Sequence, residues 1–121
     1  MNWYVAVMRR SFDFSGRAPR SEYWWFVGLM LLFSIVVSAV FEIVSSDASA
    51  LASALFSLVH LVPSLAVGAR RLHDTGRTGW WQLVGFVPLI GFVALLVLMV
   101  LKGEEGANRF GDPPSPVPAD A

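Results

Sequence analysis

A histidine and an aspartate stand side by side at positions 73 and 74, inside a polar segment that covers residues 70–81. An imidazole oriented by a carboxylate can act as a general base, but only if the two groups converge in space. Adjacent residues in a turn usually diverge, there is no cysteine to serve as nucleophile, and no serine stands in a recognisable elbow. We therefore expect no enzyme activity from His73 and Asp74, and expect Asp74 to cap the turn before Gly76.

Arginines gather around this pair. The cluster comprises Arg17, Arg20, Arg70, Arg71 and Arg77. Such a collar can bind anionic phospholipid headgroups, with each basic residue contributing about 1 kcal/mol near an anionic leaflet. It can also serve only to orient the chain, without any ligand. Both interpretations stay open, and we expect Glu22 and Asp74 to pair with arginines across the cluster.

His60 is the strongly polar side chain deepest in an apolar run. An ionisable residue inside a membrane is by default a functional candidate. The alternative is structural: a hydrogen bond to a serine of a neighbouring helix, or to a carbonyl freed by Pro63. His60 and His73 have no third ligand of matching depth, so we expect neither a metal site nor a cofactor.

The composition indicates which environment holds these residues. The chain has 121 residues, of which 55% are hydrophobic and 15% charged, and its mean hydropathy is +0.60. A soluble domain of this size could not bury so much apolar surface, whereas a bilayer removes the need to do so. With no cysteine in the sequence, disulfides and thiolate metal sites are excluded.

Three apolar runs follow one another, at residues 23–44, 51–69 and 80–101. At about 1.5 Å per residue each is roughly 29–33 Å long, enough to cross a hydrocarbon core of about 30 Å. We predict an all-α membrane protein with three transmembrane helices. The third run contains Pro88 and Gly91, so a kinked helix and a pair of half-helices that enter and return are both open.

The two ends of the chain are more polar. Residues 1–22 mix aromatic and basic side chains, which predicts a short interfacial helix over about the first ten residues, with a frayed end as the alternative. Residues 102–121 are rich in glycine and proline, and we expect a flexible tail.

Charge predicts the orientation. Seven of the nine Lys and Arg residues lie in the N-terminal segment and around residues 70–77. Segments rich in Lys and Arg stay in the cytoplasm, so we expect the N-terminus and the arginine cluster inside. The turn near Asp47 and, for three crossings, the tail would then lie outside.

Five tryptophans lie near the ends of the apolar runs or near the N-terminus. They are Trp3, Trp24, Trp25, Trp80 and Trp81. This placement is typical of an aromatic belt at the membrane interface rather than of base stacking. The formal net charge is zero, so we expect no nucleic-acid partner.

Three motifs together form a recognisable pattern: residues 14–25 (FSGRAPRSEYWW), 70–81 (RRLHDTGRTGWW) and 102–113 (KGEEGANRFGDP). Their order and spacing resemble the YhaH-type small bacterial inner-membrane proteins, domain-of-unknown-function family 805, over about the full chain. The resemblance implies an integral protein of the bacterial inner membrane, and brings no established activity, substrate or cofactor. It also suggests that the tail motif with Asn108, Arg109 and Phe110 matters.

Two functions are compatible with these features. In the first, the chain is a non-enzymatic membrane component whose arginine-rich cytoplasmic face docks anionic lipid or a partner protein. In the second, it is a subunit of a homo-oligomeric channel or transporter for ions or small solutes, with His60 near the pathway, since three spans are too few to enclose a pore alone.

Overall fold

The computed structural model describes residues 2–116, and its regular elements are all helical. In chain order they are α1 (Asn2–Arg9), α2 (Arg20–Glu42), α3 (Ser46–Asp74), the 3₁₀ helix η1 (Gly79–Phe86) and α4 (Ile90–Val100). One isolated bridge, between Asn108 and Gly111, is the only extended pairing in this part of the chain. The predicted all-α class is confirmed.

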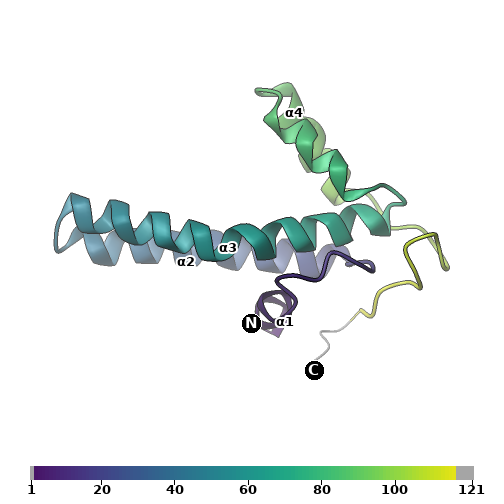
Figure 1. Ribbon diagram of the computed structural model, residues 1–121, viewed down its shortest axis with the longest axis horizontal. Coiled ribbons are helices and arrows are strands. Elements are labelled where there is room, and N and C mark those ends of the chain that lie inside the picture. The colour runs from purple at the N-terminus through teal and green to yellow at the C-terminus, as the bar shows by residue number, and fades with distance from the viewer. Residues whose placement is uncertain (1, 117–121) are drawn as a thin grey trace.

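Helices α2 and α3 form a long antiparallel hairpin (Figure 1). At 1.5 Å per residue they are roughly 35 and 43 Å long. Both are long and apolar enough to cross a membrane, and within residues 2–116 no other helix is. At the tight turn Ser45 caps α3 by accepting a hydrogen bond from the Ala48 amide, and the Ser38 and Ser49 hydroxyls meet at 3.1 Å.

Both helices extend beyond the apolar runs. Helix α2 begins at Arg20, and α3 continues to Asp74 instead of ending near Ala69. The first five residues of the polar segment 70–81 therefore belong to the end of α3, and its last three belong to η1. Because residues three or four apart on a helix share a face, this extension aligns Arg70, Arg71 and Asp74 for contacts that a loop would not hold.

The third apolar run is broken between Phe86 and Ile90, where Leu89 adopts a positive φ of 60°. The two halves pack so closely that a Cβ on Gly91 would lie 1.9 Å from the Val84 carbonyl oxygen. The run starts beside Ala69, because a Cβ on Gly79 would lie 2.7 Å from the Ala69 Cβ. Its other end also returns to α3, where the Met99 carbonyl accepts a hydrogen bond from Arg71.

Two continuous helices are thus long and apolar enough to span a membrane, and the third run takes the broken form that Pro88 and Gly91 left open. The run begins and ends near the same end of α3, so its two ends are not separated by a bilayer thickness. Figure 1 shows α4 leaving the hairpin at a steep angle. A glycine at the contact and a proline at the break are the physical reasons for the difference from one straight helix.

Helix α1 lies across the hairpin and is seen nearly end-on in Figure 1. Its Val7 side chain is fully buried with Ala18, Phe26 and Val67 in one small core. Tyr4 stacks on Phe26, with ring centroids 5.5 Å apart. The N-terminal helix is therefore present, and it is packed against both long helices rather than frayed.

Candidate functional site

One end of the hairpin holds a buried charge cluster that we call the junction: Arg17, Glu22, Arg70, Arg71 and Asp74. All five side chains are buried. Asp74 binds two arginines at once, with Oδ1 2.9 Å from Arg17 Nε and Oδ2 2.7 Å from Arg71 Nη1. One carboxylate thus joins the N-terminal segment to the last turn of α3, and removing it would leave two buried cations facing each other.

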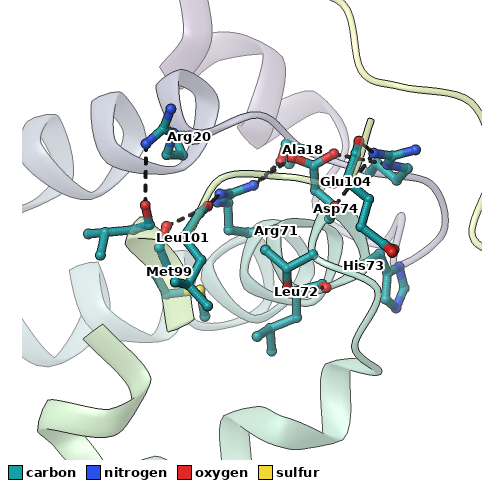
Figure 2. A network of polar contacts seen from close by, with 12 residues as sticks. Ala18, Arg20, Arg71, Leu72, His73, Asp74, Met99, Leu101 and Glu104 are labelled. Carbon is teal, nitrogen blue, oxygen red and sulfur yellow. Dashed lines mark hydrogen bonds and ion pairs between the residues drawn. The ribbon is translucent and has the colours of Figure 1, made fainter. Parts of the chain in front are cut away.

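Arg71 also binds three carbonyl groups (Figure 2). Its Nη1 donates to Ala18 at 3.1 Å and its Nε to Met99 at 3.0 Å, while Nη2 donates to Leu101. The last carbonyls of a helix have no partner within the helix. Arg71 supplies donors to the end of α4, and this contact fixes where the third apolar run returns.

Arg17 extends the junction to the tail. Its Nη1 donates to the carbonyls of Gly106 at 2.6 Å and Gly111 at 3.3 Å, and its Nη2 to that of Glu104. The Glu104 amide in turn donates to the Asp74 carbonyl at 2.7 Å. A glycine is required at position 103, because a Cβ there would lie 2.0 Å from an Asp74 carboxylate oxygen.

Arg70 is fully buried and forms an ion pair with Glu22 from the first turn of α2. Its backbone carbonyl accepts from the Ala18 amide at 2.9 Å. Nε and Nη2 of Arg70 have no hydrogen-bond partner among the residues that the structure describes. The expected pairing of Glu22 and Asp74 with arginines is present, but inside the protein rather than on an exposed collar.

The tail motif returns to the same end of α3. Asn108 donates to the His73 carbonyl at 2.9 Å, and Phe110 stacks on the His73 ring with centroids 4.0 Å apart. Arg109 donates to the Gly76 carbonyl at 3.3 Å and lies over the Phe110 ring. Residues 103–111 therefore lie beside the arginine cluster, which differs from a loose tail on the opposite side of the membrane. Many of the hydrogen bonds between the tail and the end of α3 go to backbone carbonyls. Every residue has such a group, so no side-chain pattern in the sequence predicts these contacts.

His73 and Asp74 do not form a catalytic pair. The His73 Nδ1 donates to the Gly16 carbonyl at 2.9 Å, whereas the Asp74 carboxylate binds Arg17 and Arg71. Their side chains serve different neighbours, as expected for adjacent residues. Asp74 does not cap the turn before Gly76 with its side chain; the Thr75 hydroxyl donates to the Leu72 carbonyl there instead.

His60 is buried in α3, and its partner comes from α1. Nδ1 donates to the Phe56 carbonyl at 2.8 Å, which leaves Nε2 to accept from the Tyr4 hydroxyl. Burial raises the pKa of Tyr4, so the hydroxyl keeps its proton. The expected partners, a serine or a carbonyl near Pro63, are not used. Both ring nitrogens are occupied within the chain, so the geometry adds nothing to a transport role for His60.

Comparison with known proteins assigns the family. The model for "Protein of unknown function (DUF805)" matches residues 11–112. The chain belongs to the DUF805 family. That match includes the first two motifs, and the third up to Asp112, so it covers the residues that build the junction and its tail contacts.

Similar proteins in this family come from Escherichia coli. Inner membrane protein YhaI of strain K12 is 40% identical over 114 residues, covering 94% of this chain and 96% of the relative. Inner membrane protein YhaH of the same strain is 33% identical over 117 residues, covering 94% and 97%. No solved structure matches the chain. By homology, this DUF805 chain is a protein of the bacterial inner membrane.

Two arginines of the predicted cluster are left partly or fully accessible. Arg77 is half-buried, and its Nη1 donates to the Thr75 carbonyl at 3.4 Å. Arg20 is exposed at the start of α2 and reaches the Val100 carbonyl at 3.4 Å. In this DUF805 chain, Arg20 and Arg77 can meet an external anion, whereas Arg17, Arg70 and Arg71 already have internal partners.

Proposed function

We propose that the chain is a non-enzymatic component of the bacterial inner membrane that crosses the bilayer twice and docks anionic lipid headgroups at the junction end of its hairpin. The N-terminus, the segment between α3 and η1 and the tail all lie in the cytoplasm. The broken third run enters the bilayer from that side and returns to it.

The distribution of charge supports this orientation. All nine Lys and Arg residues belong to segments at the junction end: residues 9–20, 70–77 and 102–109. The turn at the other end carries the acidic residues Glu42 and Asp47 and no basic residue. Lys and Arg near the spans keep their segment in the cytoplasm. Because the tail with Lys102 and Arg109 returns to the junction end, every Lys and Arg residue lies at that end of the hairpin.

The observation that carries lipid docking is a shallow groove of about 360 Å³ lined by Arg20, Ser21, Trp24 and Trp25. It lies at the N-terminus of α2, where Pro19 precedes the helix and makes no side-chain cap. Uncapped amides at a helix N-terminus favour an anion. An arginine and two tryptophans there match the headgroup layer of a bilayer.

Orientation can be tested with reporter fusions after residue 116 and at Arg77 in the full chain. Both reporters are expected to register cytoplasm, with a fusion at Ser45 registering periplasm as the matched control. A periplasmic report after residue 116 would show that the third run crosses the membrane and would overturn the two-span arrangement.

Headgroup docking can be tested with spin-labelled phosphatidylglycerol and phosphatidylcholine around the purified protein in bilayers. Arg20→Gln is expected to lower the preference for phosphatidylglycerol by up to about fivefold, since one basic residue near the surface contributes about 1 kcal/mol. Lys102→Gln is the matched control, because Lys102 is exposed but lies 3.3 Å from Glu105. An unchanged preference in Arg20→Gln contradicts docking at this groove.

A further inference from the structure

A second, deeper pocket lies between α3 and η1. Its volume is about 400 Å³, within the range of roughly 300–1,000 Å³ that small-molecule sites occupy. Most of its lining is apolar and includes Phe14, Leu65, Ala69, His73, Trp80 and Leu83. A pocket of this kind, opening beside exposed leucines of a membrane hairpin, is accessible to a hydrocarbon chain.

The walls of this pocket are fixed by close contacts rather than left by loose packing. Gly79 allows η1 to approach Ala69, where a Cβ would lie 2.7 Å from that side chain. Gln82 then joins the two helices by donating to the Leu65 carbonyl at 3.1 Å. A Cβ on Gly68 would lie 2.3 Å from the Gln82 amide oxygen, so the end of the Gln82 side chain packs directly on Gly68.

A polar pocket adjoins the apolar one, and Phe14 and His73 line both. The polar pocket also contains Asp13 and Arg109. The Asp13 carboxylate is already bound by Arg10 at 2.6 Å and by the Ser15 hydroxyl at 2.7 Å. The charge that remains for a ligand is therefore positive, and it belongs to Arg109.

His73 contributes a further polar atom at the boundary. Its Nδ1 donates to the Gly16 carbonyl and one face of its ring is covered by Phe110. Because the proton is on Nδ1, Nε2 is left as an acceptor, and it has no hydrogen-bond partner among residues 2–116. An apolar pocket with a cation and a hydrogen-bond acceptor at its mouth matches an amphiphile whose head carries an anionic phosphate and a hydroxyl group.

We propose that these two pockets bind one phospholipid from the surrounding bilayer, with an acyl chain between α3 and η1, an anionic headgroup phosphate against Arg109 and a headgroup hydroxyl that donates to His73. This inference rests on the proposed function in one respect: the junction end must lie at the headgroup layer. Unlike the groove at Arg20, the site holds a single lipid in a defined place.

The chain-binding half can be tested by native mass spectrometry of the detergent-solubilised full chain with added phosphatidylglycerol. One retained lipid is expected. Leu65→Trp fills the pocket and is expected to lower its retention by at least about tenfold, a loss of about 1.4 kcal/mol. Leu61→Trp is the matched control, since Leu61 is exposed one turn earlier on α3 and does not line the pocket.

Leu83→Trp fills the same pocket from η1 and keeps the test informative if Leu65→Trp does not fold. Arg109→Gln is expected to reduce the retention of phosphatidylglycerol to that of phosphatidylcholine, with Lys102→Gln as its control. Equal retention in the two leucine variants and their control means that only non-specific boundary lipid is bound, and overturns the inference.

The two lipid proposals fail separately. Arg20→Gln is expected to leave the single retained phosphatidylglycerol in place, because Arg20 does not line either pocket. If Arg20→Gln removes that lipid while Leu65→Trp and Leu83→Trp retain it, the inference is overturned and docking at the α2 groove stands. If the leucine variants remove the lipid and Arg20→Gln does not, and if Arg20→Gln also leaves the spin-label preference unchanged, the inference stands and docking at the α2 groove does not.

Discussion

One end of the α2–α3 hairpin buries charged side chains, and the other end exposes large aliphatic ones. At the junction, Arg70 and Arg71 are 0% exposed. At the turn, Ile43 and Val44 are 85% and 76% exposed. In a soluble protein both observations would be anomalous, because charged groups face water and large aliphatic groups are buried.

The difference shows which interactions define this fold. Aliphatic side chains in hydrocarbon gain little from leaving lipid for protein, so the turn end needs only close helix packing and hydrogen bonds such as Ser38 to Ser49. At the junction, charged side chains and backbone carbonyls need partners, and those partners come from four separate segments of the chain. We infer that the junction, more than the hairpin, determines where α4 and the tail lie.

The largest effect is expected at the carboxylate that holds the junction together. Asp74→Asn leaves Arg17 and Arg71 buried without a counter-charge, and should lower the free energy of unfolding by about 3–5 kcal/mol. Denaturant unfolding of the purified protein in mild detergent measures this loss, and limited proteolysis should show earlier cleavage within residues 103–111.

Asp47→Asn provides the matched change at the turn end. Asp47 is exposed in the first turn of α3, and its loss should cost at most about 1 kcal/mol. Equal effects of the two substitutions would remove the contrast between the ends, since Asp74 would then behave as a surface residue.

An intermediate effect is expected where the broken run folds on itself. In Gly91→Ala the added Cβ lies 1.9 Å from the Val84 carbonyl oxygen, and such overpacking should destabilise the protein by about 1–3 kcal/mol. Gly28→Ala is the control in α2: its Cβ meets no atom within 4 Å, and alanine should stabilise that helix by up to about 1 kcal/mol. Unfolding in detergent compares the pair, and a Gly91→Ala protein as stable as Gly28→Ala would indicate that α4 does not pack on η1.

The smallest effect is expected at the exposed rim of the junction, where Arg10 pairs with Asp13. Partial burial alone would raise the pKa of Asp13. Hydrogen bonds from Ser15 and Arg10 lower this pKa by a larger amount, so it falls to about 2. A carboxylate with a lowered pKa stabilises the folded state above its unfolded value of about 4, and the contribution is lost as the pH falls toward 2.

An NMR titration of Asp13 should therefore have its midpoint near pH 2, and Ser15→Ala should raise that midpoint by removing the hydroxyl donor. Ser11→Ala is the control, because the Ser11 hydroxyl donates to the Met8 carbonyl instead. A midpoint near 4 that Ser15→Ala leaves unchanged would show that the rim pair does not form.

Much of the membrane architecture could be read from local sequence. The apolar runs predicted α2 and α3, and Pro88 with Gly91 indicated where the third run breaks. The arginine positions also marked one end of the hairpin as different from the other. Hydropathy, the backbone restriction of proline and side-chain charge act through the residue itself and its near neighbours. Their effects can therefore be predicted without knowing the tertiary contacts.

The tertiary structure alone decided what the arginines do. Arg17 and Asp74 are 57 positions apart and Arg17 and Gly111 are 94 apart, and only the returned tail brings them together. The same holds for Tyr4 with His60, which no local pattern links. Many acceptors at the junction are backbone carbonyls, which every residue possesses, so the sequence could mark the charged donors but not the groups that bury and satisfy them.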